Sequence, residues 1–167
     1  MFLDITRAIQ NPGTEFPFTM SEEVAAQDIL GEQVTFEKAA ISGFFSSVGG
    51  KIFVRGRLST TAYALCANCL APAKAPIEVL FQETFIQKMD VPDEEAFIYE
   101  GSKLDFADMA LSLSVLALPM RFLCKEDCQG FCGVCGKDME HCTCQKENQQ
   151  RHPFEKLQQM LLKDEEV

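Results

Sequence analysis

Eight cysteines carry the chemistry that this chain of 167 residues offers. Two pairs, Cys66 with Cys69 and Cys132 with Cys135, have the Cys-x-x-Cys spacing that lets both thiolates bind one ion. Structural zinc takes four such ligands, so eight thiols complete two tetrahedral sites. We therefore expect two zinc ions. The expected ligands are Cys66, Cys69, Cys124, Cys128, Cys132, Cys135, Cys142 and Cys144.

The order of the cysteines along the chain suggests how they group. The most economical grouping closes one site from the last four cysteines, which lie within one short stretch. The first four then form the other site, which ties two segments far apart in the sequence together. An exchanged grouping, in which Cys66 and Cys69 join Cys132 and Cys135, stays open, and His141 is an alternative ligand to one thiolate.

A reducing compartment favours metal binding over disulfides for an even number of cysteines. The first residues, Met1 to Arg7, lack the basic and apolar stretches of a secretory signal. The longest apolar stretch, Phe106 to Leu118, is shorter than the roughly 18 residues that cross a bilayer. We therefore expect a cytoplasmic protein with no membrane span. Iron-sulfur clusters and a redox pair are the alternatives to zinc.

The sequence lacks the groups that catalysis requires. A catalytic zinc keeps an open coordination position and a nearby base, whereas four-cysteine sites are closed. The two histidines, His141 and His152, stand in no recognisable Ser-His or Cys-His arrangement, and the sequence has no phosphate-cradling glycine loop. We therefore expect no enzymatic activity.

Charge restricts the partners that the protein can bind. The formal net charge of −10 opposes broad contact with a phosphate backbone, and each four-thiolate zinc site adds about −2. The candidate residues for contact with RNA or a partner are Arg55, Arg57, Lys125 and Lys137. Each of these residues also has an alternative role that involves no RNA or partner. The two arginines can pair with acids across strands, and the two lysines can offset the negative charge of the thiolates.

The elements that position the cysteines begin with a β-meander between Val34 and Ile86, where β-branched or aromatic residues alternate with polar ones. Gly49-Gly50 predicts a turn between two of its strands. Cys66 to Cys69 falls at another turn of the meander, which is a suitable place for a metal ligand pair. Alternation predicts one buried and one exposed face. The expected buried positions include Ile52, Val54, Leu58, Ile77, Val79, Phe81 and Phe85, and the expected exposed ones include Phe53, Arg55, Arg57, Glu78, Gln82 and Thr84.

A helix is predicted to begin at Ser102 or Asp105 and to end before Pro119. Its apolar positions surround most of the circumference, so we expect it to be buried against the sheet. These positions are Phe106, Met109, Ala110, Leu111, Leu113, Val115, Leu116, Ala117 and Leu118.

Two other segments are predicted outside this helix. Residues 90–95 form an acidic loop. A last helix begins at Pro153, and its apolar stripe either packs on the domain or binds a partner. The fold class is α+β: an antiparallel sheet with one buried helix in residues 1–120, and a zinc-binding lobe that ends in a helix in residues 121–167.

In three segments the chain resembles the YceD family, the large ribosomal RNA subunit accumulation proteins of bacteria and plastids. The resemblance rests on Cys66-Ala-Asn-Cys69-Leu70 after a strand, on the helix that runs into Leu118-Pro119, and on the segment from Leu123 to Gly136. The common form of the family has proline where Gly133 stands. Some members lack most of the later cysteines, which implies that the second site is an accessory staple.

The resemblance implies a non-enzymatic role in the accumulation or processing of large-subunit ribosomal RNA. Because the chain is acidic, we expect it to act mainly through a basic ribosomal protein or processing factor, with weak local contact with RNA. Another class of function is a zinc- or redox-responsive regulator that releases its metal when the thiols oxidise. A hydrolase acting on RNA ranks third, because no residues for it are found.

Overall fold

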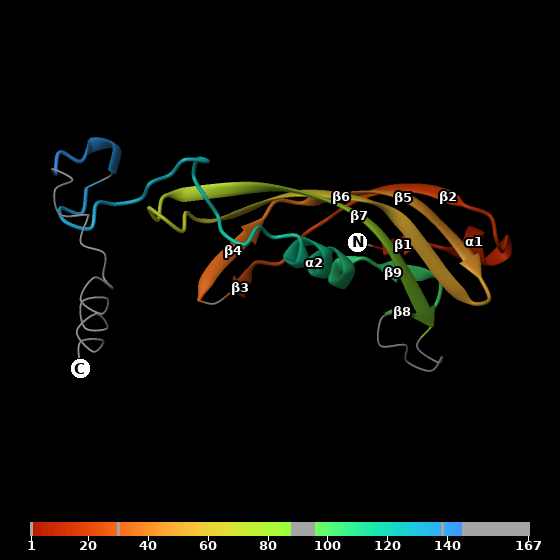
Figure 1. Ribbon diagram of the computed structural model, residues 1–167. Coiled ribbons are helices and arrows are strands. Elements are labelled where there is room, and N and C mark those ends of the chain that lie inside the picture. Colours follow the sequence, from red (N-terminus) through yellow and green to blue (C-terminus); the bar gives the residue numbers. More distant parts are fainter. Residues whose placement is uncertain (1, 30, 88–95, 138, 145–167) are drawn as a thin grey trace, which may run out of the picture. The chain divides into compact units, whose positions relative to one another are not determined.

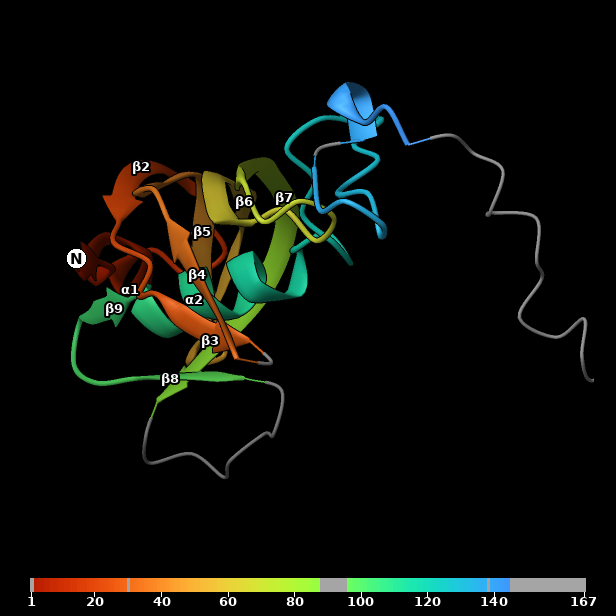
Figure 2. The same ribbon diagram turned by 90° about the vertical axis from the view of Figure 1, so that its left-hand side faces the viewer.

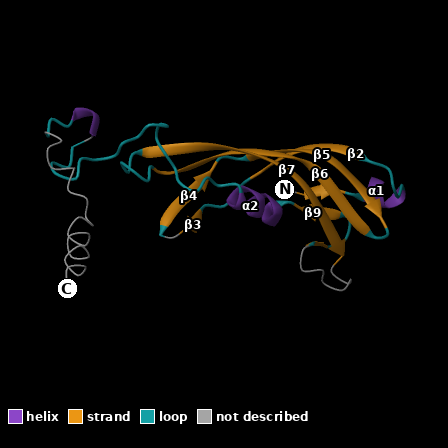
Figure 3. Ribbon diagram, in the orientation of Figure 1, coloured by secondary structure: helices purple, strands orange, loops and turns teal. Residues whose placement is uncertain are grey.

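The computed structural model describes residues 2–29, 31–87, 96–137 and 139–144. The chain divides into two compact units, Met1–Cys128 and Gln129–Val167, whereas the sequence places the boundary at residue 120. Strands make up most of the first unit (Figures 1 and 3), as an α+β class dominated by a sheet requires. The strands are β1 (Phe2–Asp4), β2 (Phe16–Glu22), β3 (Gln27–Ile29), β4 (Glu32–Phe36), β5 (Ala39–Val48), β6 (Lys51–Leu65), β7 (Pro72–Gln87), β8 (Phe97–Tyr99) and β9 (Lys103–Asp105), and the helices are α1 (Thr6–Gln10), α2 (Ala107–Leu116) and the 3₁₀ turn η1 (Met139–His141).

Strand β6 is the centre of the main sheet. From Ile52 to Leu65 it pairs with β7 on one side, while its other side pairs first with β5 and then with β4. Strands β2 and β3 extend the sheet beyond β5 and β4, and β1 pairs separately with β9. The pairings are antiparallel, as predicted for the meander, except that β8 runs parallel to β7.

The predicted hairpin between β5 and β6 is confirmed. Gly49 and Gly50 have φ angles of 59° and 80°, which glycine adopts without strain. The alternation along β6 is also confirmed, because Ile52, Val54 and Leu58 are buried while the residues between them are exposed or half-buried.

Helix α2 lies against one face of the sheet (Figures 1 and 2), with Met109, Ala110 and Ser114 buried. Neither predicted start is the N-cap, which is Phe106 and makes no side-chain capping bond. Asp105 lies one residue before it, and its Oδ1 accepts a hydrogen bond from the Ala107 amide at 3.1 Å. The helix is buried against the sheet as expected, but its apolar surface is not buried throughout. Leu116 is 83% exposed, and it continues a row of exposed residues formed by Asp108 and Ser112 at a spacing of four along the helix.

Strand β2 lies before the predicted meander, and its alternation of Phe16, Phe18 and Met20 on the inner side is a signal that sequence reasoning missed. Two predicted segments, the acidic loop at residues 90–95 and the helix beginning at Pro153, lie outside the described residues. No helix in the described part of the chain has the length and apolar character to cross a membrane.

Candidate metal centres

The first four cysteines meet where β6 turns into β7, and we call this group the hairpin site. The Cys66 and Cys128 sulfurs lie 3.7 Å apart and those of Cys69 and Cys124 lie 3.5 Å apart. All four sulfurs are within 4.8 Å of one another. A tetrahedron with Zn–S bonds of about 2.3 Å has edges of about 3.8 Å. The arrangement therefore has the size of a four-thiolate zinc site.

Backbone hydrogen bonds shape the turn that carries the first pair. The Cys66 amide donates to the Ala71 carbonyl at 2.8 Å, and the Leu70 amide donates to the Cys66 carbonyl at 2.9 Å. The turn is joined to the segment after α2, because the Ala67 amide donates to the Phe122 carbonyl at 2.9 Å. The Asn68 side-chain amide donates to the Cys128 carbonyl at 2.5 Å. These contacts hold the two distant segments together independently of a metal.

The hairpin site also rests on an apolar cluster. Cys66 is fully buried and Cys128 is nearly so. Both belong to one cluster of buried residues whose other members are Val34, Ala62, Ala64, Ala73, Ile77 and Phe122. One side of the site is therefore closed to water, while Cys124 is exposed on the other side.

The last four cysteines form a second group within the second unit, which we call the loop site. The Cys135 and Cys142 sulfurs lie 3.6 Å apart, and the sulfurs of Cys132, Cys135, Cys142 and Cys144 are within 4.8 Å of one another. Backbone amides point at the sulfurs, since the Val134 amide lies 3.4 Å from the Cys132 sulfur. The two groups of thiols are those of the economical grouping, and the exchanged grouping is not found.

The two Cys-x-x-Cys turns have the same backbone pattern. In the loop site the Cys132 amide donates to the Lys137 carbonyl at 2.7 Å and the Gly136 amide donates to the Cys132 carbonyl at 2.8 Å, which matches the bonds of the first turn. The residue after each pair has a left-handed backbone, with φ of 68° at Gly136 and 57° at Leu70. Sequence reasoning missed the role of Leu70. Aligning the two Cys-x-x-Cys segments would have placed it opposite a glycine.

The thiols of the hairpin site do not ionise alike without a cation. Desolvation raises the pKa of Cys66, but hydrogen bonds from the Cys124, Asn68 and Cys69 amides outweigh it and lower the value to about 6. Hydrogen bonding with the Cys69 sulfur, together with the other thiols, raises the pKa of Cys124 to about 12. A first thiolate therefore forms near neutral pH, and its charge opposes the formation of further thiolates.

The loop site shows the same division. The Cys135 and Val134 amides lower the pKa of Cys132 to about 6. Hydrogen bonding with the Cys135 sulfur and then the Cys142 sulfur raises the pKa of Cys144 to about 12. Each site has one thiolate ready to form and needs a cation before the full set of four can lose its protons.

The donor sets fit a structural metal. All eight thiols are free, and their separations are far from the S–S bond of about 2.05 Å in a disulfide. Four sulfur donors in a closed tetrahedron are typical of structural zinc and leave no open position for a substrate. The same donor sets are compatible with iron.

The predicted contact residues fall in three places. Arg55 and Arg57 lie on β6 and both form ion pairs, with Glu15 at 2.8 Å and Glu78 at 2.6 Å. Of the two alternatives for these arginines, pairing with acids is therefore observed, although both side chains remain more than half exposed. Lys125 follows Cys124 of the hairpin site, and its carbonyl accepts a hydrogen bond from the Cys128 amide at 3.2 Å. Lys137 belongs to the loop site, where its carbonyl accepts the Cys132 amide.

The fold and the two cysteine groups define a class of protein: a β-sheet domain with two groups of four cysteines that could each hold a metal ion. Residues 54–161 match the model of the family described as large ribosomal RNA subunit accumulation protein YceD. The chain belongs to the YceD family, and the resemblance noted from the sequence is confirmed.

Three curated relatives show the same similarity to the chain. Uncharacterized proteins Rv2926c and MT2996 of two Mycobacterium tuberculosis strains and Mb2951c of Mycobacterium bovis are each 26% identical to it over 145 residues. These matches cover 81% of this chain and 69% of each relative. No solved structure matches the chain.

Proposed function

We propose that this protein is a non-enzymatic accessory factor in large ribosomal subunit biogenesis, and that its two cysteine groups hold structural zinc ions. The family description names the accumulation of large-subunit ribosomal RNA. The observation that carries the zinc assignment is the pair of four-thiol groups, each with all sulfurs within 4.8 Å. In this proposal the metals hold a binding surface in shape and take no part in chemistry.

The main partner in this proposal is a basic ribosomal protein or processing factor in the cytoplasm. A chain with a net charge of −10 attracts a basic protein over a distance and repels nucleic acid over most of its surface. Two four-thiolate zinc sites make the protein more acidic by about −4 in total. RNA is then a secondary contact, limited to a part of the surface with a different local charge.

Purification from the native host tests the proposal. The tagged protein is expected to co-sediment with precursors of the large subunit and to contain two zinc ions per chain. Treating the lysate with ribonuclease separates the two kinds of contact, because a protein partner stays bound when the RNA is digested. Sedimentation apart from ribosomal particles would reject the role in biogenesis, and absence of zinc or a brown iron chromophore would reject the metal assignment.

A second candidate function is a regulator that responds to oxidants. Each site has one exposed cysteine, Cys124 in the hairpin site and Cys135 in the loop site, which an oxidant can reach. On this alternative, mild peroxide releases zinc reversibly and changes the binding of partners. If partner binding is the same before and after metal release, the protein is not a switch.

A further inference from the structure

One face of the main sheet differs in charge from the rest of the protein. We call the side chains that point away from the core on β2, β5, β6 and β7 the outward face. No helix described in the first unit covers it, because α2 lies against the opposite side (Figure 1). The outward face carries four basic residues and one acid, whereas the whole chain has 15 basic and 25 acidic residues. These five residues are Lys51, Arg55, Arg57, Lys74 and Glu78.

Exposed aromatic rings lie among these cations. Phe44 and Phe53 are 45% and 37% exposed, although rings of this size are usually buried. The alternation of the strands explains why they are outside, because their neighbours Phe45, Ile52 and Val54 fill the core. The two exposed rings therefore contribute to a surface.

The strand register brings the rings and cations together. Phe44 lies directly opposite Arg55, while Phe53 lies opposite Ser46, two residues further along β5. The two rings are therefore diagonal neighbours, about 7–8 Å apart. The Arg55 guanidinium already stacks on the Phe44 ring, 5.8 Å from its centroid.

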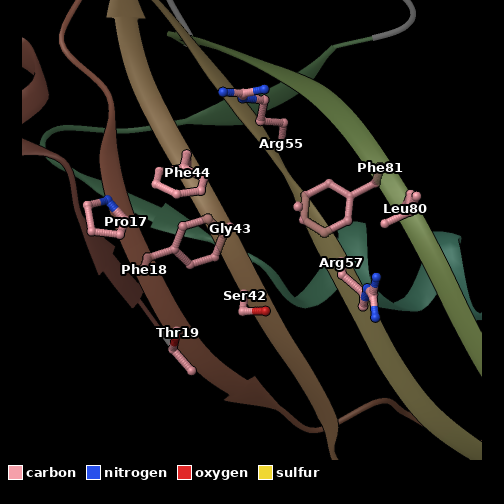
Figure 4. A pocket seen from close by; sticks show the side chains of 11 residues that line it. Pro17, Phe18, Thr19, Ser42, Gly43, Phe44, Arg55, Arg57, Leu80 and Phe81 are labelled. Carbon is pink, nitrogen blue, oxygen red and sulfur yellow. The ribbon is translucent and has the colours of Figure 1, made fainter.

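A shallow hollow lies beside the Phe44 ring. It is lined by Phe44 from β5, Arg55 and Arg57 from β6, and Leu80 from β7 (Figure 4). Leu80 is 76% exposed and pairs across the strands with Arg57. The hollow thus offers an apolar floor with two guanidinium groups at its sides.

We propose that the outward face of β2, β5, β6 and β7 binds single-stranded RNA, with bases stacked on Phe44 and Phe53 and phosphates bound by Arg55 and Arg57. Aromatic rings interleaved with cations on an open sheet suit single strands, since stacking requires unpaired bases. A regular duplex hides its base faces and cannot use the rings. An acidic protein segment would use the cations but would leave the two rings without a stacking partner.

The ion pairs of both arginines are compatible with this role. Each pair is exposed, so exchanging a carboxylate for a phosphate costs little. Glu15 and Glu78 hold the guanidinium groups in place until RNA arrives. Because only four cations lie on the face, binding is expected to be weak and to have a shallow dependence on salt, with a slope of about −3 for a single strand.

The inference rests on the proposed function only for the identity of the RNA, which would be unpaired regions of large-subunit ribosomal RNA. The chemistry of the face stands apart from it. A short labelled single-stranded RNA of mixed sequence, and the same sequence as a duplex, therefore serve as probes for the full-length protein loaded with zinc.

Fluorescence anisotropy at low salt tests the role of the rings. The single strand is expected to bind more tightly than the duplex. F44A and F53A should each weaken the binding of the single strand about fivefold or more. F44Y should restore it, because the ring is kept. The matched control is F2A, since Phe2 is an exposed ring on β1 that lies outside this face, and it should leave the affinity unchanged.

Arginine variants test the phosphate contacts. R55Q and R57Q should each lower the salt slope by about 0.7, whereas R7Q on α1 should not change it. Thermal melts identify any variant whose fold is damaged, and if an alanine variant is damaged the salt slopes of R55Q and R57Q still test the face. Equal binding of single strand and duplex, or F44A and F53A affinities equal to that of F2A, would overturn the inference.

A photo-crosslinking amino acid in place of Leu80 tests the occupant in cells. Crosslinks to ribosomal RNA support the inference, and crosslinks to a protein alone overturn it. The proposed function has a separate readout, which is sedimentation with large-subunit precursors. If the wild type sediments with these particles but position 80 crosslinks only to protein, the RNA inference fails and the proposed function stands.

Discussion

The hairpin site and the loop site have similar thiol geometry but different surroundings. In the hairpin site, sulfurs 3.5 and 3.7 Å apart come from residues 55 and 62 positions apart in the sequence. In the loop site, the sulfurs 3.6 Å apart come from residues seven positions apart. The first arrangement ties distant parts of the fold together, whereas the second closes a single loop.

Burial separates the two sites further. The hairpin site shares an apolar cluster with six other buried residues. Among the described residues of the second unit, the buried ones are Gly130 and Cys132, while Phe131 and Val134 are exposed. A metal therefore adds to an existing core at the hairpin site, whereas among the described residues of the loop site it takes the place of a core.

The largest expected effect is that of removing both metals. Structural zinc contributes about 10–16 kcal/mol of binding free energy in small peptides at pH 7, and the described residues of the loop site offer little buried apolar surface to compensate for its loss. Treatment with a strong chelator should unfold residues 129–144 while the sheet of the first unit stays folded with a lower melting temperature. Amide resonances in a two-dimensional NMR spectrum follow both units separately. Retention of dispersed loop-site resonances without metal would contradict the comparison.

A matched pair of substitutions gives the next largest effect. C66S and C132S each replace the first cysteine of a Cys-x-x-Cys pair, and each should lower the zinc content from two ions to one. C66S also places a hydroxyl in the buried cluster, so it should lower the melting temperature of the first unit by about 5–10 °C. C132S should leave that transition unchanged. Calorimetry and metal analysis measure both results.

The opposite outcome would show that the two sites are coupled. If C132S lowered the melting of the first unit as much as C66S does, the loop site would support the sheet. A variant remote from both sites, F2A, controls for the general effect of a substitution, because Phe2 is exposed on β1.

The sequence was sufficient for features that local spacing determines. The turn at Gly49-Gly50 and the alternation along β6 followed from the residues themselves. The grouping of the thiols followed from chain order, because the last four cysteines can meet only by closing a short loop. The turn, the alternation and the loop site depend on contacts between residues that are near in sequence, or on a period of two. The hairpin site, whose residues are far apart in sequence, was predicted only as the four cysteines that remained.

The features that the sequence did not predict depend on distant partners. Strands β1 and β9 are three residues each and exist because they pair with each other; too short for a period, they give no signal. The exposure of Leu116 depends on which side of α2 meets the sheet, and apolar residues around the whole helix gave no direction. The exposed side of β6 with Phe53, Arg55 and Arg57 was predicted, but the position of Phe44 opposite Arg55 was missed, because it depends on the register between β5 and β6.

The smallest expected effect concerns the residue after each Cys-x-x-Cys pair. Leu70 and Gly136 both have positive φ angles, a conformation that costs a residue with a Cβ about 1–2 kcal/mol and costs glycine almost nothing. G136L should therefore weaken zinc retention at the loop site about fivefold or more, as competition with a coloured chelator measures. L70G should strengthen retention at the hairpin site by less than that, because glycine also gains freedom in the unfolded chain.

Leu70 is two-thirds exposed, so its side chain does not contribute enough packing to explain why the strained position is not a glycine. A strained, exposed apolar residue is more consistent with a contact surface than with the stability of the turn. L70G should then retain zinc at least as well as the wild type but sediment less with large-subunit precursors. If L70G instead loses zinc more readily and sediments normally, Leu70 serves the turn alone, and the two Cys-x-x-Cys turns differ in sequence without differing in function.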